Sequence, residues 1–191
     1  ASGEPDFIYG ILSRGGSFTM VNSVLTARDS GSGIGISLQG GSAELAHNVI
    51  LFADVRRSFA LSVGNMESLS VVNSQLHNLR RGTQEETLIY IDEPVGRLTI
   101  AGNNLFGWDR VLTDGGAARR GWGFTSPGVL RSIEELHRAD RRIESVRRLE
   151  AFDNISESSE RTFEAGSSVA DERAFALQIG SNSLRGGVPA E

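Results

Sequence analysis

The chain has 191 residues and a formal net charge of −5, and all 19 of its basic residues are arginine. It contains no cysteine, which excludes disulfide bonds and thiolate catalysis. The acidic balance argues against nucleic-acid binding, which needs a basic surface, and no apolar run approaches the ~20 residues of a membrane-spanning helix. Neither a nucleic acid nor a membrane span is therefore expected.

A short phrase returns along the chain. Each copy alternates apolar residues with others, reaches an Asn or His, and ends on Leu or Ile. The copies are FTMVNSVL (18–25), ELAHNVI (44–50), LSVVNSQL (69–76), LTIAGNNL (98–105) and LQIGSNSL (177–184). The first four copies end 25 to 29 residues apart. A period of this length indicates stacked units, because one unit alone cannot bury its apolar side.

After each of the first three copies a second alternating run follows, at residues 33–39, 58–64 and 87–92. Alternation with a period of two predicts strands, so one side of each run faces a core and the other faces outward. The inward positions of the second runs are Ile36, Leu38, Leu61, Val63, Ile89 and Ile91, and those of the phrases are Met20, Leu45, Val71, Ile100 and Ile179. A third, short strand is expected at the end of each phrase.

Short strands with tight turns every 25 residues or so predict an all-β fold, a right-handed parallel β-helix of about five coils. An Asn repeated at one corner suits such a turn, because Asn tolerates a left-handed backbone and its amide can bond to neighbouring coils. The expected stack contains Asn22, Asn73 and Asn103, with His47 and Asn48 in the second coil. The phrase resembles the coil repeat of the pectate-lyase-like superfamily of right-handed parallel β-helices. That resemblance implies an architecture and no single chemistry, since the superfamily includes lyases, hydrolases, phage tailspikes and non-catalytic surface proteins.

Three regions follow from the repeat: coils over 1–112, an interruption over 113–172, and a returning coil over 173–191. In the interruption, Ser126 and Pro127 predict a helix start, and apolar residues at helical spacing extend it over about 127–150. We expect this helix to dock on the coils or cap them. An alternative is that LEAFDNI (149–155) is a degenerate coil phrase with Asp153 and Asn154 at its corner. At the first coil, an open end is expected to expose apolar side chains and unpaired strand groups, which favours covering by another chain or a missing segment.

The loops after the phrases carry arginine at a similar position, namely Arg28, Arg56, Arg80 and Arg110. Stacked coils lie ~4.8 Å apart, so such a row fits an extended acidic polysaccharide, with each guanidinium offering a bidentate fork. The alternative reading is a solvated face, because Asp29, Asp54 and Asp109 stand beside three of these positions and relieve the repulsion.

A second candidate surface is the outward side of the second runs, a shallow polar face made of Ser37, Gln39, Ser62, Tyr90 and Asp92. Trp108 and Trp122, both beside glycines, are candidate stacking platforms for sugar rings. Packing beneath a loop is the alternative for each tryptophan.

Catalysis finds less support. Glycoside hydrolysis needs two carboxylates facing each other across a bond, whereas Asp92 and Glu93 are adjacent on one strand and point to opposite sides. The clustered carboxylates of the calcium-dependent lyases and the Gly-His-Gly hydrolase signature of the superfamily are missing. A turn role is expected for His47, and His77 is expected to face solvent. No catalytic residue, metal or cofactor is assigned.

The sequence thus predicts a non-catalytic surface or assembly module, adhesin-like or tailspike-like, that binds a polysaccharide or a partner chain along a repetitive face. The expected location is extracellular, at a cell surface or on a virion. The alternative is a polysaccharide lyase or glycoside hydrolase acting on an acidic glycan, with its chemistry near His77, Arg80, Asp92 and Asp109. A third possibility is a structural subunit that hides its open coil ends by self-association.

Overall fold

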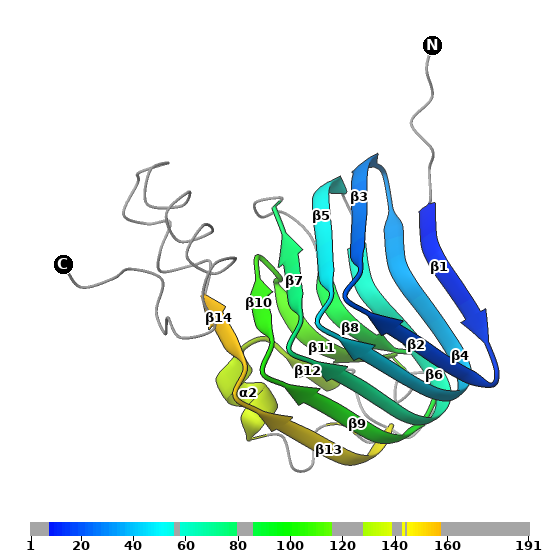
Figure 1. The fold of residues 1–191 in the computed structure, drawn as a ribbon. Helices are drawn as coiled ribbons and strands as arrows, with labels where there is room; N and C mark the ends of the chain where they lie inside the picture. Colours follow the sequence, from blue (N-terminus) through cyan, green and yellow to red (C-terminus); the bar gives the residue numbers. More distant parts are fainter. Residues whose placement is uncertain are drawn as a thin grey trace.

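The computed structural model describes residues 8–55, 58–79, 86–115, 128–138, 143 and 145–157. They form a parallel β-helix of about four turns, almost entirely strand (Figure 1). The predicted all-β solenoid is confirmed. The phrase at 177–184, with Ile179, lies outside the described residues.

Each coil has three strand positions. Coil one contains β1 (Ile8–Arg14), β2 (Ser17–Val21) and β3 (Val24–Ser30). In coils two and three a single strand spans the first two positions: β4 (Gly33–Ala46) is followed by β5 (Val49–Val55), and β6 (Ser58–Val72) by β7 (Gln75–Asn78). Coil four contains β8 (Thr87–Ile91), β9 (Val95–Ala101) and β10 (Asn104–Phe106). The last, interrupted coil contains β11 (Arg110–Asp114), β13 (Val146–Phe152) and β14 (Ile155–Glu157).

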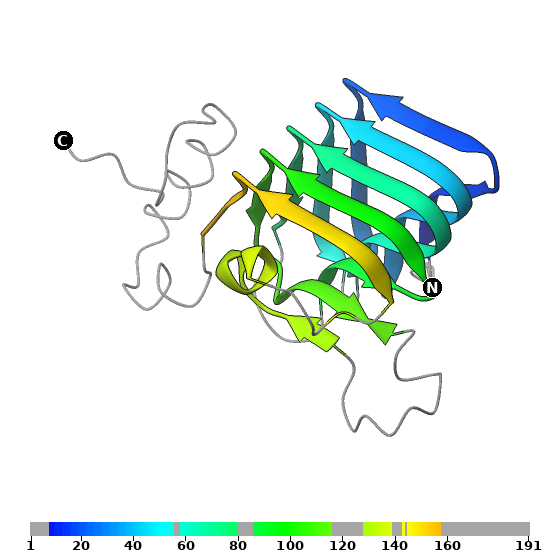
Figure 2. The ribbon, with the colours of Figure 1, turned by 90° about the horizontal axis from the view of Figure 1, so that it is seen from below.

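Equivalent strands of successive coils pair in parallel, which Figure 2 shows as a regular stack. The first and second positions, together with the short strand β12 (Gly128–Leu130), form a nine-stranded sheet, and the third position forms a five-stranded sheet in the order β14-β10-β7-β5-β3. The register advances by one coil at each step, so that Met20 pairs with Leu45, Leu45 with Val71, and Val71 with Ile100.

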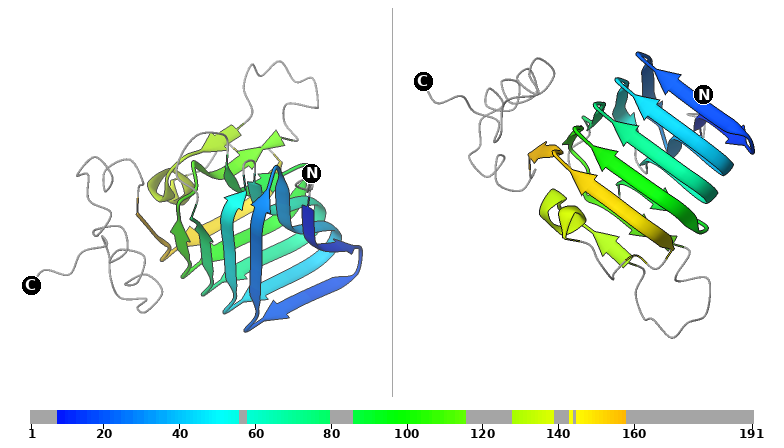
Figure 3. Two further views of the ribbon diagram at one scale, coloured as in Figure 1. Left: turned by 90° about the horizontal axis from the view of Figure 1, so that it is seen from above. Right: turned by 60° about the horizontal axis from the view of Figure 1, so that its bottom comes forward.

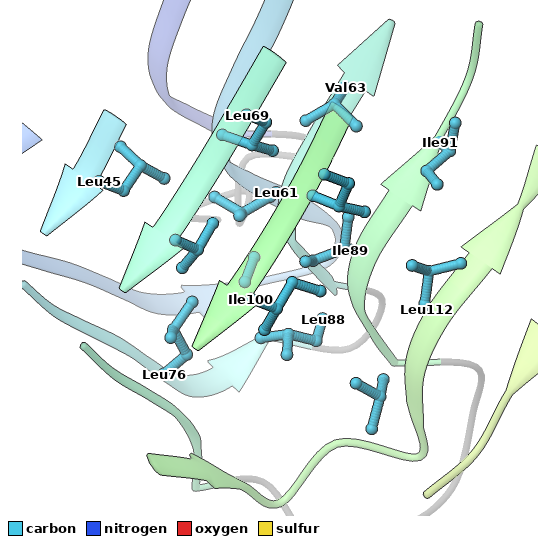
Figure 4. Close-up of a cluster of buried hydrophobic side chains, with 14 of the residues drawn as sticks. Leu45, Leu61, Val63, Leu69, Leu76, Leu88, Ile89, Ile91, Ile100 and Leu112 are labelled. Carbon is cyan, nitrogen blue, oxygen red and sulfur yellow. The ribbon is translucent and has the colours of Figure 1, made fainter. Parts of the chain in front are cut away.

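Stacked apolar side chains fill the centre of the coil, as Figure 4 shows for ten labelled residues. All the described positions predicted to point inward are buried; Met20, at 8% exposure, is the least covered of them. Some outward positions are buried too. Ser37 and Ser62 are only 6% and 8% exposed, because small side chains between paired strands are covered by their neighbours. The inward positions were thus predicted well, and the open polar face less so.

The helix predicted over about 127–150 is wrong in extent. The structure has a short strand β12 (Gly128–Leu130), then α2 (Ile133–His137), and then β13. Strand β13 pairs in parallel with β9, with Leu149 beside Leu98 and Ala151 beside Ile100. The hydrogen bonds between β13 and β9, and the packing of Leu149 and Ala151 against the core, outweigh the helical spacing of the apolar residues in this segment. The alternative, a degenerate coil phrase with Asp153 and Asn154 at its corner, is the one that the structure adopts.

The short helix lies at the end of the coil stack (Figure 3). Its N-cap is Ser132, whose Oγ accepts the backbone N–H of Glu135 at 3.1 Å. Ile133 and Leu136 are buried in the core, and α2 contacts β11, β12 and β13. Strand β12 pairs antiparallel with the outer edge of β11. Together α2 and β12 cover the C-terminal end of the core, as expected for a docked helix.

Candidate functional site

The predicted arginine row is only partly described. Arg28 is exposed on β3 in the five-stranded sheet, whereas Arg110 is half-buried and begins β11 in the nine-stranded sheet. Arg56 and Arg80 lie outside the described residues. The two described arginines belong to different sheets and to the first and last coils, so they do not form one site. Binding of an acidic polysaccharide by the arginines of this row remains a prediction.

The polar face of the second runs contains an aromatic pair that the sequence reading missed. Tyr90, half-buried, stacks on Phe59 of the preceding coil with ring centroids 4.8 Å apart and an interplanar angle of 25°. Alternation does not find this pair, because Phe59 shares its parity with the inward Leu61 and Val63, whereas Tyr90 lies at an outward position. Asp92 is half-buried at the end of β8, where its backbone N–H donates to the carbonyl of Val63 at 2.8 Å.

Trp108 packs in the core. It is 8% exposed, its Nε1–H donates to the carbonyl of Leu76 at 2.9 Å, and its ring meets that of Phe52 edge-on at 5.5 Å. The packing alternative is therefore confirmed for Trp108. Trp122 lies outside the described residues.

The residues named for a possible enzyme do not come together as a reactive group. His77 was expected to face solvent, and this is wrong: it is fully buried on β7, edge-to-face with Phe106 at 6.0 Å. Burial lowers the pKa of His77 to about 4. Asp109 is exposed, and its Oδ2 accepts the backbone N–H of Glu86 at 3.4 Å. Arg80 lies outside the described residues.

A buried polar cluster was also missed. Asn78 donates through Nδ2 to Oε2 of Glu86 at 2.6 Å and to Oγ of Ser58 at 3.4 Å. All three side chains are about 1% exposed. Sequence alternation does not find such a cluster, because Glu86 enters it from the loop before β8. Within the described ranges, no group of three metal-ligating side chains occurs, and no helix is long and apolar enough to span a membrane.

The corner after the second strand of each coil is the most regular polar feature. One residue per corner has a left-handed backbone, with φ between 48° and 64°: Asn22, His47, Asn73, Gly102 and Asp153. The turn role of His47 is thus confirmed. The next residue carries the polar contacts between coils, and these residues are Ser23, Asn48, Ser74, Asn103 and Asn154. We call these five residues the corner ladder.

The corner ladder corrects the predicted asparagine stack. Asn103 and Asn48 belong to the ladder, whereas Asn22 and Asn73 are exposed residues that supply the left-handed turn. Two adjacent positions with different tasks were read as one, because Asn is favoured for both. Asn48, Asn103 and Asn154 also donate through Nδ2 to the carbonyls of Met20, Val71 and Ile100, at 2.7 to 2.8 Å.

Coil one forms an open end within the described part of the chain. Strands β1, β2 and β3 each pair on one side only, with coil two. Four of its large apolar residues are exposed, Tyr9 at 57%, Leu12 at 51%, Val21 at 42% and Val24 at 71%. Ile11, Phe18 and Leu25 are only partly buried against the core. This is the exposed end that the sequence predicts. At the other end, α2 covers the core and β12 the outer edge of β11, while β13 and β14 pair on one side only among the described residues.

Comparisons of the chain with protein-family models, with curated proteins and with solved structures found no match.

Proposed function

We propose that this chain is a non-catalytic β-helical assembly module whose first coil is the contact surface for a partner chain. The observation that supports it is the difference between the two ends of the described coils. In the last coil, α2 covers the core and β12 covers the outer edge of β11, while β13 and β14 pair on one side only and Phe152 is 52% exposed. Coil one has no such cover among the described residues, and it presents four exposed large apolar side chains beside three strand edges. Such an end is a template for pairing with another chain, and natural proteins cover it or pair it.

The proposal includes two expectations from the sequence. One is a relationship to the pectate-lyase-like superfamily, which the parallel coils and the corner ladder support as an architecture. The other is a location outside the cell, at a cell surface or on a virion, where adhesin-like and tailspike-like assemblies occur.

Site-specific photo-cross-linking in the cells that make the protein tests the assembly role. Benzoylphenylalanine replaces Leu12 on coil one or, as the matched control, Arg97, which is exposed on β9 at the side of the stack. We expect position 12 to give a defined cross-linked polypeptide, identified by mass spectrometry, and position 97 to give none. If position 12 yields no protein cross-link, the proposed function is wrong.

A polysaccharide is the second candidate partner, and the Phe59–Tyr90 pair is the observation that favours it. Stacked, half-buried aromatic rings on an outward polar face offer a platform for a sugar ring. A glycan array that includes acidic polysaccharides, read with and without Ca²⁺, is the test. Binding that falls in Tyr90→Ala and leaves the glycan intact supports this candidate; shortened or unsaturated products would instead reveal an enzyme.

A further inference from the structure

We propose that the phrase at 177–184 forms two further strands on the last coil, one parallel to β13 and one parallel to β14, with Asn182 as the next residue of the corner ladder. The docking edge and its occupant belong to the same chain, so this proposal does not depend on the proposed assembly function. It assigns a place and a register to a segment that lies outside the described residues.

The outer edges of β13 and β14 are unpaired among the described residues. Strand β13, the last of the stack in Figure 2, pairs with β9 only, and β14 pairs with β10 only. Leu149 and Ala151 of β13 are only partly buried against the core, whereas their partners on β9 are at most 1% exposed. Backbone groups and apolar side chains at this edge therefore lack the neighbour that every earlier coil has.

The first strand position of the next layer is already filled. Strand β12 pairs with the outer edge of β11, and α2 follows it with Ile133 and Leu136 in the core. The layer beyond the last coil thus lacks one strand at the second position and one at the third. A phrase comprises these two strands and the corner between them, as β9 and β10 do in coil four.

The corner ladder also stops at this edge. The backbone N–H of each ladder residue donates to the side-chain oxygen of the ladder residue in the next coil. The four bonds run from Ser23 to Asn48 at 3.0 Å, Asn48 to Ser74 at 3.1 Å, Ser74 to Asn103 at 2.9 Å and Asn103 to Asn154 at 3.1 Å. The backbone N–H of Asn154 is next in this series, and within the described ranges no acceptor takes it. Because Asn154 is only 8% exposed, an acceptor there would remove a costly unpaired donor.

The phrase LQIGSNSL supplies such an acceptor together with the missing apolar residues. Asn182 stands at its ladder position, as the alignment with LTIAGNNL of coil four shows. Leu177, Ile179 and Leu184 then fall at the inward positions of the two strands. The corner differs in one residue, because Ser181 stands at the left-handed position where the other corners have Asn, His, Gly or Asp.

The distance along the chain fits a single coil. Ladder residues of the first four coils follow one another by 25, 26 and 29 residues, and Asn182 follows Asn154 by 28. The 29 residues that lead to the corner of coil four include the complete first-position strand β8 and the loop before it. The 28 residues after Asn154 can therefore return from β14 to the start of the second position, past β12.

The register fixes the contacts at the new corner. Asn103 and Asn154 each donate through Nδ2 to the carbonyl three residues before the preceding ladder residue. We therefore expect Asn182 to accept the N–H of Asn154 through Oδ1 and to donate through Nδ2 to the carbonyl of Ala151. On the outward face of the same strands, Gln178 should lie beside Glu150.

Pairs of introduced cysteines in the full chain test this register, because the chain has no cysteine of its own. Neighbouring positions on parallel strands have Cα atoms ~4.8 Å apart, which suits a disulfide. We expect Glu150→Cys with Gln178→Cys, and separately Arg148→Cys with Ala176→Cys, to form a disulfide within one molecule under mild oxidation. An antiparallel strand cannot satisfy both pairs. Mass spectrometry of unreduced digests identifies the linked peptides.

Two matched pairs serve as controls. Arg148→Cys with Gln178→Cys is two residues out of register, which adds about 6.6 Å along the strand and exceeds the reach of a disulfide. Thr19→Cys with Gln178→Cys places the first cysteine at the equivalent outward position of coil one. We expect neither pair to close.

Amide hydrogen exchange at Asn154 tests the ladder bond, and nuclear magnetic resonance measures it. Asn182→Ala should speed exchange of this amide about threefold to tenfold, the value of one hydrogen bond. Asn182→Ser should keep most of the protection, because Ser74 serves as the acceptor in coil three. Ser183→Ala, a truncation beside the ladder position, should leave exchange unchanged.

Three results would overturn the proposal. Preferential closure of the Thr19 pair would place the phrase on coil one, and disulfide-linked dimers would place it on a second copy. Exchange at Asn154 that is the same in Asn182→Ala, Ser183→Ala and the unchanged chain would show that Asn182 does not extend the ladder. Closure of both in-register pairs, with faster exchange in Asn182→Ala alone, is the result that supports it.

Discussion

The Asn103 side chain connects two other residues of the corner ladder, Ser74 and Asn154. Fully buried, it accepts the N–H of Ser74 at 2.9 Å and donates to the carbonyl of Val71 at 2.8 Å and to Oδ1 of Asn154 at 3.0 Å. A backbone N–H that loses its acceptor inside the protein costs the desolvation of that group. The ladder therefore stabilises the fold mainly by leaving no corner group unpaired.

We expect Asn103→Ala to lower the free energy of unfolding by about 2 to 4 kcal/mol, since Ser74 N–H loses its side-chain acceptor, the carbonyl of Val71 loses a donor, and Asn154 Oδ1 keeps only the backbone N–H of residue 103. Urea denaturation monitored by circular dichroism measures this loss. Asn22→Gly is the control: it changes an exposed left-handed position that glycine accepts, and should stay within about 1 kcal/mol of the wild type. Equal losses in the two variants would contradict a special role of the ladder.

His77 makes stability depend on pH in a defined direction. Burial lowers its pKa in the folded chain from 6.5 to about 4, so between these values the unfolded chain binds more protons. The stabilising contribution is complete above pH 6.5 and is lost as the pH falls toward 4, by about 3 kcal/mol in total. We expect His77→Leu to remove this part of the pH dependence in urea titrations at pH 7, 6, 5 and 4.5.

The exposed His47→Asn is the matched control and should keep the wild-type profile. A profile in which His77→Leu is as steep as the wild type would assign the pH dependence to other groups. The burial of His77 was not predictable from alternation, since the residue follows the inward Leu76. Its neighbours across the sheet, Leu51 and Phe106, cover it.

At the scale of elements, β13 shows where a sequence pattern misleads. Its apolar residues Val146 and Leu149 also fit a helix spacing, and the helix signal at Ser126 and Pro127 extends that reading. The competing phrase LEAFDNI has Ala151 where coil four has Ile100, and Ser156 stands beside Leu105, so the repeat is hard to recognise. The neighbouring strand decides between helix and strand here, because β9 offers an edge for parallel pairing and apolar residues to pack against, and the local sequence reveals neither.

The short helix α2 is the cap that replaces a further coil at the end of the core. Leu136 is 1% exposed within the core cluster. We expect Leu136→Ala to cost about 2 to 5 kcal/mol, the usual range for such a truncation. Glu134→Ala, on the exposed side of the same helix, should cost far less. Thermal unfolding of the two variants measures the difference, and similar values would show that α2 does not seal the coils.

For the whole molecule, the sequence was most informative where it repeats. The period predicts the parallel coils, and the alternation predicts the inward residues Ile36, Leu61 and Ile89, because a stack must bury the same face in every unit. The exposed first coil follows from the same logic. The Asn78–Glu86–Ser58 cluster and the Phe59–Tyr90 pair occur once each, so the sequence repeat does not predict them. Contacts that depend on one loop position or one pair of side chains need the folded chain.

One turn of the scaffold tolerates very different lengths. Between the first and second strand positions, coil two uses Gly40 and Gly41, whereas the last coil places residues 115–145 at the same point. Strand β13 nevertheless keeps its register on β9. Loop closure becomes only slowly costlier with length, so this turn is a natural grafting point: a foreign epitope or a whole small domain inserted at Gly40–Gly41 would be displayed from the side of the stack while the coils beneath it stay in step.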